Sequence, residues 1–157
     1  MKQKGIHVSH YLKHPYDQTF HQIDGDTNPP THRLYASTSL WRFLRTGIHD
    51  VPIRRMIFEI ELIRQLLNHG LEQHRLDRLT QEQIDEPVIV CEHKDGKHTL
   101  VDGSHRLMRR VYARLDFFDC YVVPPEVWEH FIVYGDGLQD MLQSYTPETL
   151  QNSKSYL

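Results

Sequence analysis

The sequence lacks three features that would place it in a specialised class of protein. It has only two cysteines, which excludes a framework of several disulfide bonds. No apolar run approaches the roughly 20 residues of a membrane-spanning helix, and no apolar segment follows the first residues. The formal net charge is -3 with histidine neutral, so no overall basic field attracts nucleic acid. We therefore expect a cytoplasmic protein with no membrane partner.

What is present is the composition of a folded domain. Of the 157 residues, 39% are hydrophobic and 25% are charged, a balance typical of one globular domain rather than a disordered chain. Cys91 and Cys120 both lie in apolar runs that read as strands, so we predict two reduced cysteines in the core.

The chain is expected to have three segments. Residues 1–50 contain many histidines and turn-forming pairs with little periodicity, which predicts an irregular N-terminal arm packed on the core. Within this arm, the apolar residues of Ser39–Leu44 predict a short helix that ends at Gly47. Residues 51–145 form the main predicted domain, and residues 146–157 form a polar tail.

From Val51 onwards the pattern predicts an α+β fold, with a small mixed β-sheet and flanking helices. Thr80 with Gln83 three residues later is a helix-start signal, and Asp95-Gly96 favours a two-residue hairpin turn. Strands are expected over residues 51–57, 88–91, 99–101 and 119–123. Helices are expected over residues 60–67, 80–85, 107–115 and 127–132, with a connection over 71–79.

The turn that follows the strand at residues 99–101 is the candidate functional site. Gly103 permits a sharp reversal, and the helix that opens after it begins with backbone N–H groups that have no partner within the helix. Ser104 adds a hydroxyl, His105 a titratable ring and Arg106 a forked cation. These groups predict a site for the phosphates of a nucleotide.

Asp102 makes the hypothesis of a nucleotide site more specific, but the same residues also allow an ordinary structural explanation. A carboxylate beside a phosphate indicates a metal ion or a substrate hydroxyl between the two, which favours transfer chemistry. The alternative is a plain helix start, with Asp102-Gly103 as a turn and Ser104 as the N-cap. Arg106 argues against it, because a cation at a helix N-terminus costs about 0.3–1 kcal/mol unless an anion is bound.

The region from about residue 51 to 125 resembles the ParB/sulfiredoxin superfamily. Pro87–Val90 is similar to its Pro-Val-Ile-Val strand, and Gly103–Arg106 matches its Gly-X-X-Arg turn-to-helix motif, with the same order of elements. The resemblance implies nucleotide binding, since ParB proteins bind CTP, sulfiredoxins bind ATP and free serine kinases bind ATP or ADP.

The motif is most similar to the Asp-Gly-His-His-Arg of free serine kinases. Asp102, Gly103, His105 and Arg106 match it position by position, whereas Ser104 replaces its first histidine. Ser104 also stands where sulfiredoxins have their catalytic cysteine, so peroxiredoxin repair is not expected. The resemblance implies that Gly103 to Arg106 hold phosphates, that Asp102 and His105 are catalytic, and that Asp102 holds Mg²⁺ with ATP, ADP or CTP.

Glu59 is a candidate general base. Kinases of this superfamily present an acidic residue from the corresponding region, and phosphoryl transfer to a hydroxyl needs only modest proton removal. The alternative is that Glu59 stabilises the N-terminus of its own helix. The sequence therefore predicts an enzyme, a nucleotide-dependent phosphotransferase of kinase type that acts on a hydroxyl of a small molecule or a nucleotide.

Two other functions are kept open. The first is a ParB-like module that binds nucleic acid through a basic helix face, although such a face is more often simply solvated; its residues are Arg109, Arg110 and Arg114. The second is a metal-dependent nuclease built around the hairpin, with ligands from His93, Asp95, His98, Asp102 and His105. A weaker metal candidate is the spacing of His7, His10 and His14.

Overall fold

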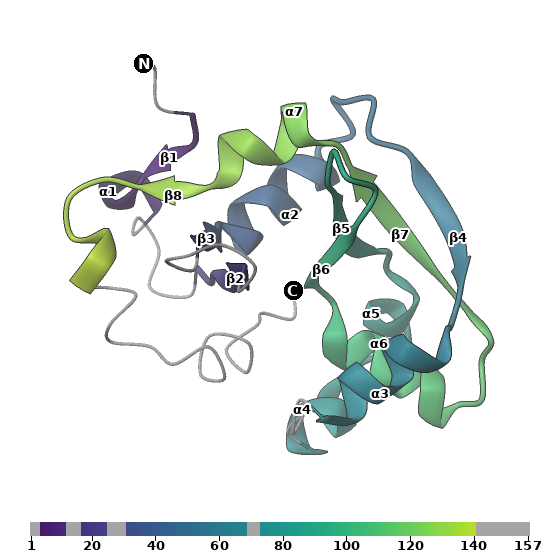
Figure 1. Ribbon diagram of the computed structural model, residues 1–157. Coiled ribbons are helices and arrows are strands. Elements are labelled where there is room, and N and C mark those ends of the chain that lie inside the picture. Colours follow the sequence, from purple (N-terminus) through teal and green to yellow (C-terminus); the bar gives the residue numbers. More distant parts are fainter. Residues whose placement is uncertain (1–3, 12–16, 25–30, 69–72, 141–157) are drawn as a thin grey trace. The chain divides into compact units, whose positions relative to one another are not determined.

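The computed structural model describes residues 4–11, 17–24, 31–68 and 73–140 of the chain (Figure 1). These residues group into two compact units: residues 50–124 form one, and residues 4–49 with 125–140 form the other. The first unit begins where the sequence predicts the main domain to begin, whereas the residues from Pro125 group with the N-terminal segment. The predicted tail, residues 146–157, lies outside the described residues, and the packing of an arm on the core stays a prediction.

The unit of residues 50–124 is built on a four-stranded sheet in the order β4-β7-β5-β6. The two inner strands are β7 and β5. β7 is antiparallel to β4 and parallel to β5, and β5 is antiparallel to β6. The strands are β4 (Ile53–Ile57), β5 (Val88–Glu92), β6 (His98–Asp102) and β7 (Phe117–Val123). The predicted α+β class with a small mixed sheet and flanking helices is confirmed.

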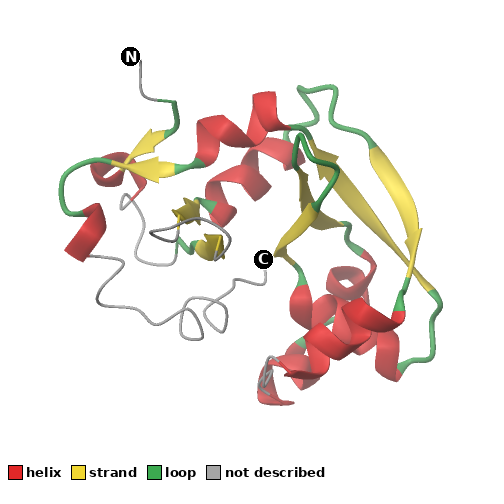
Figure 2. Ribbon diagram, in the orientation of Figure 1, coloured by secondary structure: helices red, strands yellow, loops and turns green. Residues whose placement is uncertain are grey.

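Four helices accompany this sheet (Figure 2): α3 (Ile60–Asn68), α4 (Gln73–Arg78), α5 (Gln81–Asp85) and α6 (Ser104–Tyr112). The predicted start of α5 is confirmed, because Thr80 and Gln83 form a reciprocal capping box. The predicted connection over residues 71–79 is wrong, since α4 lies there. Leu76 of α4 is buried in the core, and such tertiary packing stabilises a short helix that local signals do not reveal.

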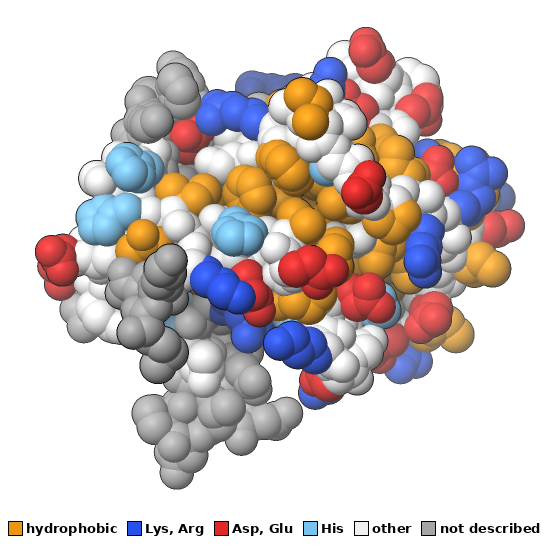
Figure 3. All heavy atoms as spheres, turned by 90° about the horizontal axis from the view of Figure 1, so that it is seen from above, with side chains coloured by type: hydrophobic (Ala, Val, Ile, Leu, Met, Phe, Trp, Pro, Cys, Tyr) orange, Lys and Arg blue, Asp and Glu red, His pale blue; other side chains and the backbone are white. Residues whose placement is uncertain are grey.

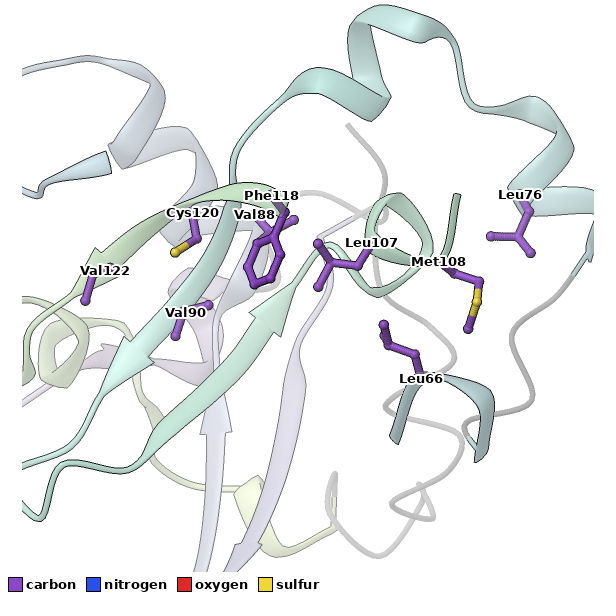
Figure 4. Packing of buried hydrophobic residues seen from close by; sticks show 9 residues of the cluster. All are labelled: Leu66, Leu76, Val88, Val90, Leu107, Met108, Phe118, Cys120 and Val122. Atoms are coloured by element: carbon purple, nitrogen blue, oxygen red, sulfur yellow. The ribbon is translucent and has the colours of Figure 1, made fainter. Parts of the chain in front are cut away.

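The core of this unit lies between the sheet and the helices (Figure 4). It consists of Leu66, Leu76, Val88, Val90, Leu107, Met108, Phe118, Cys120 and Val122. Both cysteines are buried and form no disulfide, as predicted. Burial, with the nearby Asp119, raises the pKa of the Cys120 thiol to about 11, so the thiol stays protonated at neutral pH.

The other unit is more regular than the sequence predicts. β1 (Ile6–His7) pairs in parallel with β8 (Val133–Tyr134), and β2 (Phe20–Asp24) pairs antiparallel with β3 (Thr31–Tyr35). The helical elements are α1 (Val8–Tyr11), α2 (Ser37–Arg45), α7 (Pro125–Trp128) and the 3₁₀-helix Glu129–Phe131. The helix predicted near residues 39–44 is confirmed as α2. The expectation of irregular structure is wrong, because β1 pairs with the distant β8 and β2 pairs with β3.

Among the described residues, none of the helices has both the length and the apolar character needed to span a membrane.

A histidine pair joins β2 and β3. Nε2 of His21 lies 2.7 Å from Nδ1 of His32, and the two rings are within 17° of parallel. One of the two nitrogens must donate a proton and the other must accept it, so the contact is lost if both rings are protonated. Burial, together with His32, lowers the pKa of His21.

We predict that His21 makes the stability depend on pH. Because its pKa is lowered from 6.5 in the folded state, the unfolded chain binds the proton more readily. The contribution of His21 is therefore complete well above about pH 6.5 and is lost as the pH falls. Melting temperatures measured between about pH 7.5 and 5.5 should fall more steeply for the wild type than for His21→Gln. Parallel curves would contradict this assignment.

Candidate functional site

Gly103 forms the turn between β6 and α6. Its φ is +110°, a region that side chains rarely adopt, and a Cβ at this position would lie 2.3 Å from Cγ1 of Val88 on β5. The predicted reversal is therefore present, and it requires glycine for two reasons. The second reason, the close approach of β5, is not visible in the sequence.

A β-bulge precedes this turn. Ile89 pairs with Asp102, but the next residue, Val90, pairs with Leu100, so Val101 is an extra residue in β6. A bulge changes the direction of the side chains that follow it, and here Val101 and Asp102 are both buried. The carboxylate at the end of β6 is thus held inside the protein.

Arg106 is the partner of this carboxylate. Its side chain lies in the first turn of α6, and the residue is only 1% exposed. Its Nη2 donates to Oδ2 of Asp102 at 2.8 Å, and its Nη1 donates to the backbone oxygen of Pro87 at 3.2 Å. A second carboxylate oxygen, Oε2 of Glu86, lies 3.7 Å from Nη1. One guanidinium therefore joins the end of β6, the start of α6 and the residues before β5.

These contacts change the interpretation of the motif. A cation at a helix N-terminus needs an anion, and the sequence predicts that a bound phosphate supplies it. In the structure this anion is the carboxylate of Asp102, which lies four residues before Arg106 in the chain and is only 3% exposed. Asp102 is predicted to be catalytic and a metal ligand; its carboxylate accepts from Arg106, and these two roles stay predictions. The sequence gives no signal that Glu86 or the Pro87 carbonyl is a partner of Arg106. Asp102 could have been found, because it lies four residues before Arg106, a spacing at which helical ion pairs form.

The first turn of α6 has an uncapped N-terminus. Gly103 is the N-cap residue and makes no side-chain capping bond, so Ser104 is the first helical residue rather than the N-cap. The first described bond of the helix runs from the N–H of Leu107 to the oxygen of Gly103, at 2.9 Å. Ser104, His105 and Arg106 form the first turn of the helix. Ser104 and His105 are both buried.

The basic face expected on this helix is only partly solvated. Arg110 is buried, its Nε donates to the oxygen of Phe117 at 2.8 Å, and its guanidinium lies over the Phe117 ring. The expectation of a solvated surface is therefore wrong for Arg110, because it connects α6 to the start of β7. Arg109 is half-buried, whereas Arg114 is exposed after the helix.

Glu59 lies on a different element from the turn. It is exposed immediately before α3, and its backbone oxygen accepts from the N–H of Ile63 at 3.1 Å. This position is the one expected for a residue that stabilises its own helix. The structure does not bring its carboxylate into the Asp102–Arg106 contacts described above, so its role as a general base stays a prediction.

The described residues contain no group of three or more His, Cys, Asp or Glu side chains that could hold a metal ion. On the hairpin, His93 bonds to the hydroxyl of Thr99 at 2.7 Å, and His98 is exposed. At the N-terminus, the rings of His7 and His10 are 6.3 Å apart, and His14 lies outside the described residues. The metal-dependent nuclease gains no support from this arrangement.

No protein-family model, curated protein or solved structure matches this chain. The likeness to the ParB/sulfiredoxin superfamily stays a prediction from the motif and from the order of elements.

Gly103→Ala is predicted to destabilise the protein by more than about 2 kcal/mol, since both the backbone strain and the collision with Val88 contribute. Gly96→Ala is the matched control: Gly96 also has a positive φ, +85°, but a Cβ there meets nothing within 4 Å. Urea denaturation of both variants measures the difference. Equal losses would mean that the close approach of β5 contributes nothing.

The buried ion pair is predicted to show strong coupling. Removing one partner of a buried pair typically costs about 3–5 kcal/mol, because the other charge is left uncompensated. We expect Asp102→Asn and Arg106→Met each to be strongly destabilising and the double variant to lose much less than the sum. A double-mutant cycle from urea denaturation measures the coupling, and additive losses would contradict it.

Proposed function

We propose that the protein binds a nucleotide through its phosphate groups at the start of α6. The observation that carries the proposal is the position of the nine-residue helix α6, whose N-terminus follows β6 directly through Gly103 and receives no side-chain cap from that residue. Helix N-terminal N–H groups and the helix dipole favour anions, and phosphate is the anion most often found there. Ser104 and His105 add polar side chains to the same turn.

The proposed roles differ from those that the motif alone implies. The backbone N–H groups of Ser104, His105 and Arg106 hold phosphate oxygens, and the Ser104 hydroxyl and His105 ring contribute further bonds. Arg106 acts as a positioning residue, because its guanidinium is already shared between Asp102 and the Pro87 oxygen. Gly103 shapes the turn that presents these groups.

Mg²⁺ is proposed to enter with the nucleotide rather than to reside on the protein. Asp102 is the nearest carboxylate in the motif, but its oxygen accepts from Arg106 at 2.8 Å. Magnesium commonly keeps several waters and takes its other ligands from substrate phosphates. ATP, ADP and CTP with Mg²⁺ are therefore the ligands to test, and the protein residues supply the anion site.

The reaction proposed for this site is phosphoryl transfer from the nucleotide to a hydroxyl of a small molecule or another nucleotide. The bond from the terminal phosphorus to its bridging oxygen breaks, and a bond to the hydroxyl oxygen forms. Such transfer depends mainly on positioning and on charge stabilisation, which a rigid turn supplies. His105 and Glu59 are the candidate proton acceptors for the hydroxyl.

The first turn of α6 is buried, which restricts access to the proposed site. Ser104 and His105 are 2% and 1% exposed, so a nucleotide reaches them only when the start of α6 becomes accessible. We therefore expect binding to be accompanied by a change in hydrogen exchange at the first turn of α6.

Nucleic-acid binding is the less favoured function. Arg110 is engaged with Phe117 and Asp85, which removes a residue from the expected basic face. Figure 3 shows acidic as well as basic side chains at the surface. A nucleic-acid interface usually gathers its basic residues on one surface.

We predict that a nucleotide raises the melting temperature. A ligand that binds only the folded state adds about 2.7 kcal/mol of stability at 100 times its Kd. ATP, ADP and CTP, each at millimolar concentration with Mg²⁺, should be compared by thermal denaturation. Arg106→Ala is unsuitable as a site variant, because it leaves Asp102 without its partner.

Ser104→Ala and His105→Gln are the informative variants. Both should reduce the nucleotide-dependent shift, whereas His98→Gln, which changes an exposed histidine of the hairpin, should leave it unchanged. The proposal is wrong if no nucleotide shifts the wild type, or if the two site variants shift as much as the control.

A further inference from the structure

β4 is an edge strand of the four-stranded sheet (Figure 1). It pairs with β7 along one side, and within the described part of the chain no strand pairs with its other side. Edge strands offer unpaired backbone groups to another chain, and proteins usually protect them with charges or a covering element.

The register shows which backbone groups face outward. The oxygen of Pro52 accepts from Val122 at 3.1 Å, and the N–H of Phe58 donates to Asp116 at 3.0 Å. In an antiparallel pair, bonded and non-bonded positions alternate along the strand. The N–H and C=O groups of Ile53, Arg55 and Ile57 are therefore directed away from β7.

The same three residues share one face of the sheet. Met56 packs against the core under the helices, so its neighbours Arg55 and Ile57 point to the opposite face. Ile53 is 55% exposed and Ile57 is 74% exposed. Single exposed isoleucines are ordinary, but two on one face of an unpaired edge form an apolar surface suited to another strand.

Arg55 does not make this surface strongly charged. Its Nε lies 3.1 Å from Oδ1 of Asp119 on β7, and its guanidinium lies 4.0 Å from the centre of the Phe117 ring. The cation is thus compensated by a carboxylate of the same sheet. Arg55 and Asp119 together carry no net charge, so a second copy of the strand can approach without one uncompensated cation facing another.

The outward pattern is symmetric about Arg55, with one isoleucine two residues before it and one two residues after it. A two-fold dimer requires such self-complementarity, because each contact occurs twice. We propose that β4 pairs antiparallel with β4 of a second copy of this chain. Ile53 of each copy then lies opposite Ile57 of the other, and Arg55 lies opposite its equivalent. The two sheets form one continuous sheet across the dimer.

The oligomeric state tests this proposal. We expect the wild type to sediment as a concentration-dependent dimer in analytical ultracentrifugation, and Ile57→Lys to be monomeric at the same concentrations. Leu67→Lys is the matched control: Leu67 is 58% exposed on α3, away from the strand, so this variant should dimerise like the wild type. A monomeric wild type at about 200 μM, a concentration well above the Kd of a specific dimer, would overturn the proposal.

Cross-linking tests the register. In an antiparallel pair the Cα atoms of a hydrogen-bonded residue pair lie about 5.5 Å apart, which a disulfide can span. Arg55→Cys should therefore form a covalent dimer rapidly under mild oxidation, whereas Leu67→Cys should not, and both native cysteines are buried. A dimer that is insensitive to Ile57→Lys, or that fails to cross-link at position 55, would place the interface elsewhere.

Discussion

The buried ion pair between Arg106 and Asp102 is the interaction on which the turn depends. It holds a charged side chain 1% exposed in the first turn of α6, and it is compensated by a carboxylate at the end of β6. The same guanidinium bonds to the Pro87 oxygen before β5. Because an uncompensated buried charge is costly, these three segments are constrained to meet in one arrangement. Glycine is then required at position 103, since its φ is +110° and Val88 of β5 leaves no space for a side chain.

The contacts of Arg106 give this residue a different task from the phosphate binding that the motif implies. The arginine that resembles a phosphate ligand shapes the turn instead, through its bonds to Asp102 and to the Pro87 oxygen. A helix N-terminus without a side-chain cap is a suitable site for phosphate, and Gly103 leaves α6 uncapped. The aspartate likewise belongs to the framework of the turn, because its carboxylate accepts from Arg106.

Local patterns predicted the elements whose signals are local. Helical spacing identified α3, the Thr80–Gln83 box identified the start of α5, and the Asp95-Gly96 turn placed the hairpin of β5 and β6. Elements that depend on distant partners were missed, namely α4, which packs through Leu76, and β1, which pairs with β8. At the site, the position of the turn was predicted. Its burial was not, because a bulge in β6 and the partners before β5 determine where Asp102 and Arg106 point.

The claim that phosphate is held by the backbone at the start of α6 can be tested at single residues. Amide ¹H–¹⁵N spectra of the wild type, recorded during titration with Mg²⁺-ATP, report on each N–H group separately. We expect the largest shifts at Ser104, His105 and Arg106, with the Arg106 guanidinium resonances little changed because its bonds to Asp102 and Pro87 persist. Shifts confined to other elements, or no shifts at millimolar nucleotide, would contradict it.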